Sequence, residues 1–125
     1  MKYIILTYES QQDFAARGAS EINERTQYWA AWQAYIDALL RAGVVESLHS
    51  LLPDYTATTV RRRHGRRHLH DGPYAETSEQ VSGYFVIDVF SLDQALEWAE
   101  MFPAAASGAV EVRPLMQDCV HASAT

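Results

Sequence analysis

Residues 83–102 read GYFVIDVFSLDQALEWAEMF and hold a strand, a helix start and a helix in direct succession. From Gly83 to Phe90 two sets of largely apolar side chains alternate, which is typical of a central β-strand. The tetrapeptide SLDQ at 91–94 has the form of a capping box, whose serine and glutamine satisfy free backbone N–H groups at a helix start. The helix ends at Phe102-Pro103, and its apolar stripe consists of Leu92, Ala95, Leu96, Ala99 and Phe102.

A strand followed by a helix also opens the chain. Lys2–Tyr8 is apolar and rich in β-formers, which predicts a buried strand, and Glu9–Ala19 is expected to be a polar connection. Ser20 is the expected N-cap of an amphipathic helix of about six turns, which Gly43 terminates. The apolar residues of this helix recur at three- and four-residue steps: Ile22, Trp29, Trp32, Ile36, Leu39 and Leu40.

A hairpin occupies the middle of the chain. Its expected strands are Thr56–Arg63 and Arg66–His70, joined by His64-Gly65, which suits a type I′ turn. A two-residue loop sets Arg63 opposite Arg66 and Val60 opposite Leu69. Period two then places Asp71 on the face of Leu69, if the strand reaches that far, with His68 and His70 on the opposite face.

Two further strands complete the plan, at Val44–Leu51 and Ala109–Leu115. The order predicts an α+β fold, a ferredoxin-like βαββαβ sandwich to which the hairpin adds a short strand. We expect one domain over 1–116 and a C-terminal tail at 117–125. Because no third helix is expected to cover the second face of the sheet, two copies should pack sheet against sheet as a homodimer.

Charge is unevenly distributed along the chain. Its 125 residues include 10 Lys+Arg and 16 Asp+Glu, a net charge of −6 that argues against general nucleic-acid binding. Residues 61–70 contain five arginines and no acid, so the rest of the chain, with five basic and sixteen acidic side chains, carries −11. The basic tip is either a solvated hairpin end or a contact for an anion or acidic partner.

Several classes of protein are excluded by what the sequence lacks. No apolar run reaches the roughly 18 residues of a membrane span, and no signal peptide is recognisable at the start, so we expect a cytoplasmic protein without a membrane partner. The single cysteine, Cys119, excludes an internal disulfide framework and a cysteine-based zinc site. His68 and His70 have a spacing that a metal could use, but the arginines around them argue against it. We expect no metal and no cofactor.

A family resemblance covers the chain from Tyr3 to Met116. The stretches that carry it are TATTVR at 56–61, DGPYAET at 71–77, EQ at 79–80, GYFVIDV at 83–89, ALEWA at 95–99 and VEVRP at 110–114. They resemble the DGPF-type, YCII-related proteins, with Tyr74 in place of the phenylalanine. The resemblance implies a dimeric α+β barrel, an Asp that acts as acid/base, often with a His, and a regulatory link to alternative sigma factors. Some members are similar to small dehalogenating or lyase-like enzymes.

Transferred to this sequence, the resemblance makes Asp71 the candidate catalytic acid/base, and Gly72 would let a ligand approach the backbone closely. Residues 1–48 contain no histidine, so His49 is the candidate second catalytic group. The candidate substrate-binding residues are Gly72, Tyr74, Glu76 and Arg61. The alternatives are that Asp71 caps the Gly-Pro turn and that His49 is a half-exposed strand residue.

Three classes of function follow. A lyase or hydrolase-like acid/base enzyme predicts a small-molecule cleft with Asp71 at its wall. A binding or regulatory module, docking a sigma factor or a small ligand, predicts an exposed and ordered arginine tip. A purely structural dimer predicts that Asp71 bonds backbone N–H groups of its own loop.

Overall fold

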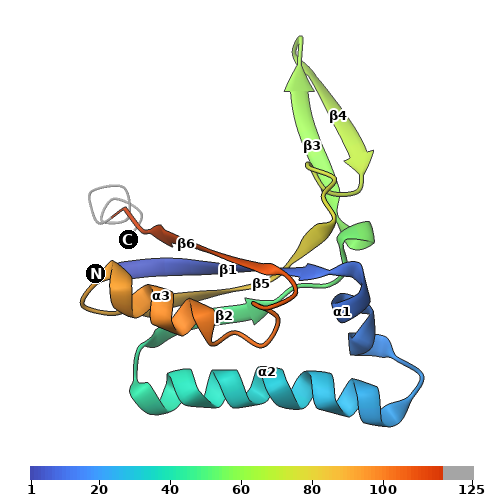
Figure 1. Cartoon of the computed structure of the whole chain (residues 1–125). Coiled ribbons are helices and arrows are strands. Elements are labelled where there is room, and N and C mark those ends of the chain that lie inside the picture. The colour runs from blue at the N-terminus through green and yellow to red at the C-terminus, as the bar shows by residue number, and fades with distance from the viewer. Residues whose placement is uncertain (117–125) are drawn as a thin grey trace.

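β1 (Lys2–Ser10) and β5 (Glu79–Asp88) form the centre of an antiparallel sheet in the computed structural model, which describes residues 1–116 (Figure 1). β2 (Val45–Ser50) pairs with the outer side of β5, and β6 (Ala109–Pro114) pairs with the outer side of β1. The resulting order, β2-β5-β1-β6, is that of a ferredoxin-like sheet. This confirms the fold class expected from the sequence.

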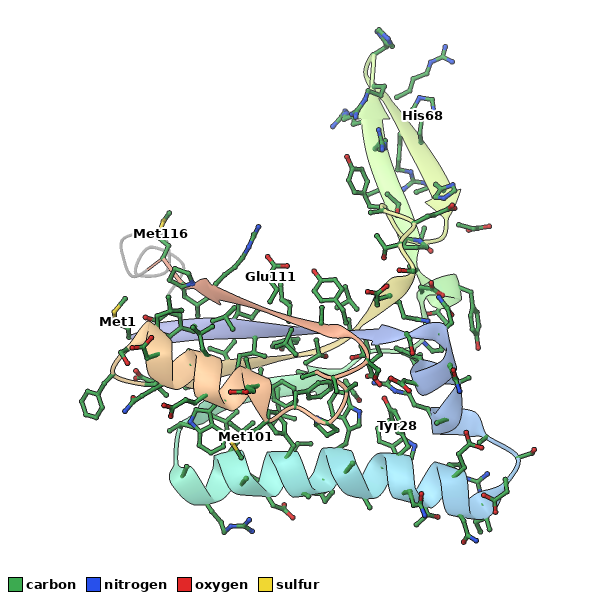
Figure 2. The ribbon with its side chains drawn as sticks, viewed as in Figure 1. Met1, Tyr28, His68, Met101, Glu111 and Met116 are labelled. Atoms are coloured by element: carbon green, nitrogen blue, oxygen red, sulfur yellow. The ribbon has the colours of Figure 1, made fainter. Side chains whose placement is uncertain are left out.

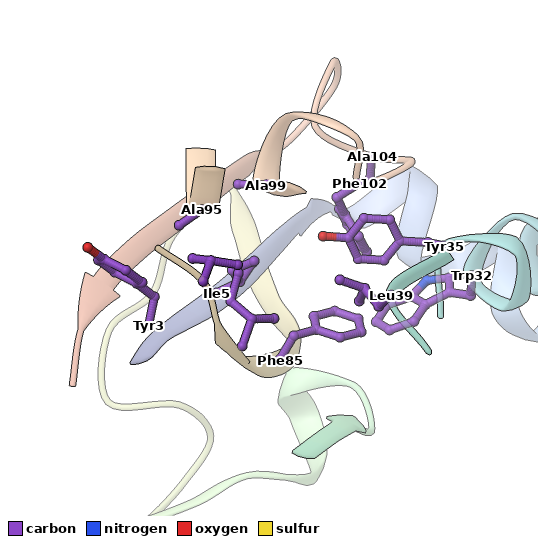
Figure 3. Packing of buried hydrophobic residues seen from close by; sticks show 12 residues of the cluster. Tyr3, Ile5, Trp32, Tyr35, Leu39, Phe85, Ala95, Ala99, Phe102 and Ala104 are labelled. Carbon is purple, nitrogen blue, oxygen red and sulfur yellow. The ribbon is translucent and has the colours of Figure 1, made fainter. Parts of the chain in front are cut away.

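Two helices pack on one face of this sheet. They are α2 (Ile22–Ala42) and α3 (Leu92–Glu100), and Figure 3 shows their side chains meeting those of the strands. Alternate residues of β1 and β5 point into this core. The buried cluster consists of Tyr3, Ile5, Trp32, Tyr35, Leu39, Phe85, Ile87, Val89, Ala95, Ala99, Phe102 and Ala104.

The helix ends agree with the sequence in two of three cases. The Ser91 hydroxyl accepts the N–H of Gln94 at 3.3 Å, as a capping box requires, and Gly43 closes α2 with a φ of 70°. The prediction of Ser20 as N-cap of α2 was wrong. Glu21 caps the helix instead, because its longer carboxylate folds back to accept the N–H groups of the second and third residues that follow it, at 3.1 and 2.7 Å.

The prediction of a polar connection over Glu9–Ala19 was also wrong. β1 continues to Ser10, whose hydroxyl caps the short helix α1 (Gln11–Ala15), and a 3₁₀ turn, η1 (Ala16–Gly18), follows. Elements of this length are too short to show a hydrophobic period. They are held by the burial of Phe14.

β5 begins at Glu79, four residues before the predicted start at Gly83. The polar residues Gln80 and Ser82 in its first half are buried, because their side chains find hydrogen-bond partners. The Ser82 hydroxyl lies 2.7 Å from that of Thr7, and the Gln80 amide accepts the N–H of Asp54 and donates to Gln11. Buried polar residues of this kind hide a strand from a hydrophobicity pattern.

The hairpin has the predicted register. β3 (Thr58–Arg63) and β4 (Arg66–Asp71) pair Arg63 with Arg66 and Val60 with Leu69, around His64 and Gly65 at φ 52° and 74°. A 3₁₀ turn, η2 (Asp54–Thr56), precedes β3. The prediction that the hairpin adds a short strand to the main sheet was wrong. β3 and β4 pair only with each other, so the hairpin is a two-stranded sheet of its own and stands off from the main sheet, on the side away from α2 (Figure 1).

The second face of the main sheet is open. Ile4, Leu6, Tyr84 and Val86 point away from α2 and α3 and are half-buried by one another. Within residues 1–116 no helix covers them, so the chain alone forms an open sheet and not a closed barrel. None of the described helices is long and apolar enough to cross a membrane.

Candidate functional site

A cavity of about 590 Å³ lies at the base of the hairpin, beside the open face of the sheet. One wall is the sheet, through Tyr8, Gln80 and Val81. The other walls are the loop before β3 and the loop after β4. The lining is mostly apolar: Tyr8, Leu51, Leu52, Pro53, Asp54, Thr56, Ala57, Pro73, Tyr74, Ala75, Thr77, Gln80 and Val81.

The DGPY turn at 71–74 is fixed against the start of β3 by backbone geometry. Gly72 has a φ of 126°, which favours glycine, and its N–H donates to the Ala57 carbonyl at 2.8 Å. The Thr59 hydroxyl donates to the Gly72 carbonyl at 2.8 Å. These bonds leave the residues that follow, Pro73 and Tyr74, as part of the cavity wall.

Asp71 lies at the last position of β4, opposite Thr58 and on the face predicted from the sequence. Its side chain is exposed, and the cavity lining begins two residues later, at Pro73. Within residues 1–116 its carboxylate takes part in no hydrogen bond or ion pair. In the single chain Asp71 therefore neither caps its own turn nor forms the cavity wall; its carboxylate is exposed, two residues before the lining begins, and has no partner within residues 1–116.

His49 lies on the edge strand β2, exposed, with its ring centroid 5.7 Å from that of Tyr84 on the open face. No hydrogen bond among the described residues joins His49 to Asp71. The structure therefore places these two candidate catalytic groups on different elements, β2 and β4, without direct contact.

Besides Gly72, there are three candidate binding residues, of which Arg61 and Tyr74 meet and Glu76 does not. The Arg61 guanidinium lies 4.8 Å from the centroid of the Tyr74 ring, a cation–π contact between β3 and the turn. Glu76 is exposed and, in the described part of the chain, pairs with neither Arg61 nor any other basic side chain. Arg61 and Tyr74 thus form one unit beside the cavity.

Sequence reasoning missed a tyrosine–carboxylate pair on the sheet wall of the cavity. The Tyr8 hydroxyl donates to Oε1 of Glu111 at 3.1 Å. Burial, together with the neighbouring Glu111 carboxylate, raises the pKa of Tyr8, so at neutral pH it is a hydrogen-bond donor at the wall. The pair was not visible in the sequence, because only the β1–β6 register brings residues 8 and 111 together.

A second missed group of polar residues lies on the helix side of the sheet. Glu9 is fully buried, and the Tyr28 hydroxyl lies 2.9 Å from each of its carboxylate oxygens. Arg17 donates to Tyr28 at 2.6 Å and forms an ion pair with Glu9 at 3.6 Å. Figure 2 shows Tyr28 between α2 and the sheet, and Glu111 on the other side of the sheet. Because its members satisfy one another, this cluster holds η1 and α2 to β1.

No group of three or more His, Cys, Asp or Glu side chains within residues 1–116 is arranged to hold a metal ion. His68 and His70 share a hairpin face without a third ligand nearby. Cys119, expected to be inert, and the tail at 117–125 lie outside the described residues.

Comparison with known proteins identifies a family, a relative and a solved structure of similar fold. The model of the YCII-related domain family matches residues 1–117. An uncharacterised protein of Rhizobium meliloti strain 1021 is 35% identical over 119 residues, covering 92% of each chain. The fold is similar to that of 5-chloro-2-hydroxyhydroquinone dehydrochlorinase from Burkholderia phenoliruptrix AC1100, solved with 2,5-dihydroxybenzoquinone. That likeness has a TM-score of 0.54 and 14% identity, over 94% of this chain and 96% of the other.

Proposed function

The chain belongs to the YCII-related domain family, and on that premise we propose that it is a homodimeric acid/base enzyme, lyase or hydrolase-like, acting on a ring-sized small molecule. The observation that carries the proposal is the cavity of about 590 Å³ between the open sheet face and the DGPY turn. Its size and largely apolar walls are those of a small-molecule site, with a few polar groups to orient the ligand.

The walls suit a flat, oxygen-bearing ligand. Tyr8 and Tyr74 supply ring faces, and the Tyr8 hydroxyl, whose proton is donated to Glu111, can accept a hydrogen bond from a ligand hydroxyl. Arg61, stacked on Tyr74, offers a positive charge for an anionic substrate. The dehydrochlorinase of similar fold was solved with 2,5-dihydroxybenzoquinone, so this compound is a suitable first probe.

The proposed base is Asp71. Its carboxylate has no partner in residues 1–116 and is free to take a proton from a substrate C–H or O–H at the cavity's edge. Gly72 allows the substrate to approach the backbone, and the Arg61 guanidinium beside Tyr74 offers positive charge to the oxygen on which negative charge develops. We propose that His49 transfers the second proton of the reaction and that Glu76 contacts a polar group of the substrate.

The homodimer is proposed because the open sheet face presents Ile4, Leu6, Tyr84 and Val86 without a cover among the described elements. A second copy packed on this face would bury these side chains and remove water from the surroundings of the cavity. Desolvation strengthens a carboxylate as a proton acceptor, which is what the proposed role of Asp71 needs.

The test uses 2,5-dihydroxybenzoquinone in D₂O, with exchange of its ring protons followed by NMR. The wild-type protein should bind the probe and accelerate exchange. Asp71→Asn should lose the acceleration by about 10²-fold or more while still binding, since a general base typically contributes 10²–10⁴. Asp93→Asn, at the start of α3 and outside the cavity lining, is the matched control and should behave as wild type. Equal exchange by wild type and Asp71→Asn would refute the catalytic proposal.

A second candidate function is a non-catalytic binding or regulatory module, which the family resemblance links to an alternative sigma factor. The observation in its favour is the exposed arginine hairpin, ordered and apart from the main sheet. This function predicts one of two results. Either the probe binds and the exchange of its ring protons is not accelerated, or the probe does not bind. A purely structural dimer predicts neither binding nor exchange.

A further inference from the structure

One face of the hairpin is bare. The register places Thr58 and Asp71, then Val60 and Leu69, then Arg62 and Arg67 on the same side, as three successive cross-strand pairs from base to tip. We call these six residues the outer hairpin face. All six are exposed, and Val60 and Leu69 keep 61% and 60% of their surface in solvent.

The opposite hairpin face contacts the DGPY turn that follows β4. Arg61 stacks on Tyr74, and the Thr59 hydroxyl bonds the Gly72 carbonyl. No such contact supports the outer hairpin face among the described residues. A two-stranded hairpin with an apolar cross-strand pair in water is marginal by itself, which indicates that another surface covers this pair.

The charge of the hairpin indicates which surface covers the outer hairpin face. Arg62 faces Arg67 and Arg63 faces Arg66 across the strands, and like charges directly opposite each other are destabilising. Within residues 1–116 none of the five hairpin arginines forms an ion pair. The remainder of the chain carries −11, so a second copy of this chain offers the complementary surface.

The position of the hairpin fits the same occupant. It rises on the side of the main sheet away from α2, which is the side of the open face (Figure 1). Two sheets packed face to face lie about 10 Å apart, and a strand of six residues spans about 20 Å. A copy seated on the open face would therefore have the hairpin of its partner alongside it, past the level of its own sheet.

We propose that the outer hairpin face is an arm that binds a second copy of this chain, with Arg62 and Arg67 against acidic side chains of the partner and Val60 and Leu69 buried beside them. In a two-fold dimer each copy gives one arm and receives one. The inference rests on the proposed homodimer and adds what holds it together.

The test compares two double variants in the same hairpin. Arg62→Glu/Arg67→Glu reverses the outer hairpin face, and Arg63→Glu/Arg66→Glu makes the same charge change on the opposite face. Sedimentation equilibrium at low salt measures the dissociation constant of the dimer. This constant should rise about tenfold or more in the first variant and change by less than about threefold in the second. High salt should weaken the wild-type dimer and narrow these differences.

The outcomes separate this inference from the homodimer itself. If the wild-type protein is a monomer, both the homodimer and the arm are refuted. A wild-type dimer that survives Arg62→Glu/Arg67→Glu, or that loses equal affinity in both variants, overturns the arm and leaves the homodimer standing. Binding of a duplex DNA oligonucleotide by the arginines, with an unchanged dimer, also overturns it.

A charge-conserving variant keeps the inference testable if the reversals unfold the chain. Lys2 is the only lysine of the sequence, so Arg62→Lys adds one new amine, at the arm. In a mixture of ¹⁴N and ¹⁵N chains, zero-length carbodiimide should join residue 62 of one copy to an Asp or Glu of the other. Arg41→Lys, exposed at the end of α2, is the control and should give less. Links within one chain only, or equal links from both variants, contradict the arm.

Discussion

The hydroxyl of Tyr28 lies 2.9 Å from both carboxylate oxygens of Glu9, a residue with no exposed surface. The same hydroxyl accepts a hydrogen bond from Arg17, whose guanidinium also lies 4.0 Å from the centroid of the Phe14 ring. One buried negative charge on β1 is thus balanced by one cation and one phenol from segments that follow it. The cost of burying Glu9 is offset only while both are present.

Removal of Arg17 should therefore be severe. Arg17→Gln leaves Glu9 buried without its counter-ion, and we expect a loss of about 3–5 kcal/mol in the free energy of unfolding. Arg41→Gln, an exposed arginine at the end of α2, should change it by less than about 0.5 kcal/mol. Urea denaturation of the two variants measures the difference, and equal losses would show that the ion pair is not structural.

Stability should fall at alkaline pH because Tyr35 is buried. The Tyr35 hydroxyl donates to the Trp98 carbonyl at 2.7 Å, and burial raises its pKa. Burial raises the pKa of Tyr28 as well. Above about pH 10 the unfolded chain has released protons that the folded chain still holds. The free energy of unfolding is therefore undiminished below pH 10 and falls as pH rises beyond it, by up to about 1.4 kcal/mol per pH unit for Tyr35.

Chemical denaturation between pH 8 and 11 checks this slope. Tyr35→Phe should lower stability at pH 8, through the lost hydrogen bond, but flatten the dependence above pH 10. An unchanged slope in Tyr35→Phe would mean that this tyrosine does not carry the effect.

Gly72→Ala should destabilise the chain by about 1–3 kcal/mol, since a side chain at a φ of 126° is strained. Its Cβ would also lie 3.4 Å from Nε2 of His70. Gly18→Ala is the matched control, because a Cβ there meets nothing within 4 Å, and it should be neutral or slightly stabilising. Thermal unfolding distinguishes the two, and similar melting temperatures would contradict the strain at Gly72.

Asp71→Asn should leave stability within about 0.5 kcal/mol of wild type, because the exposed carboxylate has no partner in residues 1–116. Its thermal unfolding would then be unchanged even where proton exchange on the probe is lost. A drop of several degrees in the melting temperature would instead show that Asp71 is structural, as a turn cap is.

Local features of the fold could be predicted from the sequence. The His64-Gly65 turn determines which residues of the hairpin face each other, and Ser91 and Gly43 mark helix ends through their own backbone chemistry. Some predictions failed because polar side chains take partners that a hydrophobicity pattern does not show. Gln80 and Ser82 bond residues far away in the sequence, whereas Glu21 folds back onto the start of its own helix.

The candidate site was predictable to the same extent. Asp71 lies on the expected face, which follows from the turn, and β4 extends to it, one residue past the predicted end at His70. Its exposure does not follow, because it depends on how far the hairpin stands from the sheet. The Tyr8–Glu111 pair depends on the β1–β6 register, which no local signal contains.

The pairing of β1 has a consequence for how the chain folds. This first strand is central, and both of its neighbours come late: Ser10 pairs with Glu79, and Tyr3 pairs with Ile87 and Pro114. During synthesis, β1 and α2 must therefore wait, with their apolar faces unpaired, until the second half of the chain has been made. The hairpin needs only neighbours in sequence and can close early, so sheet formation is the late, non-local step that limits the folding rate.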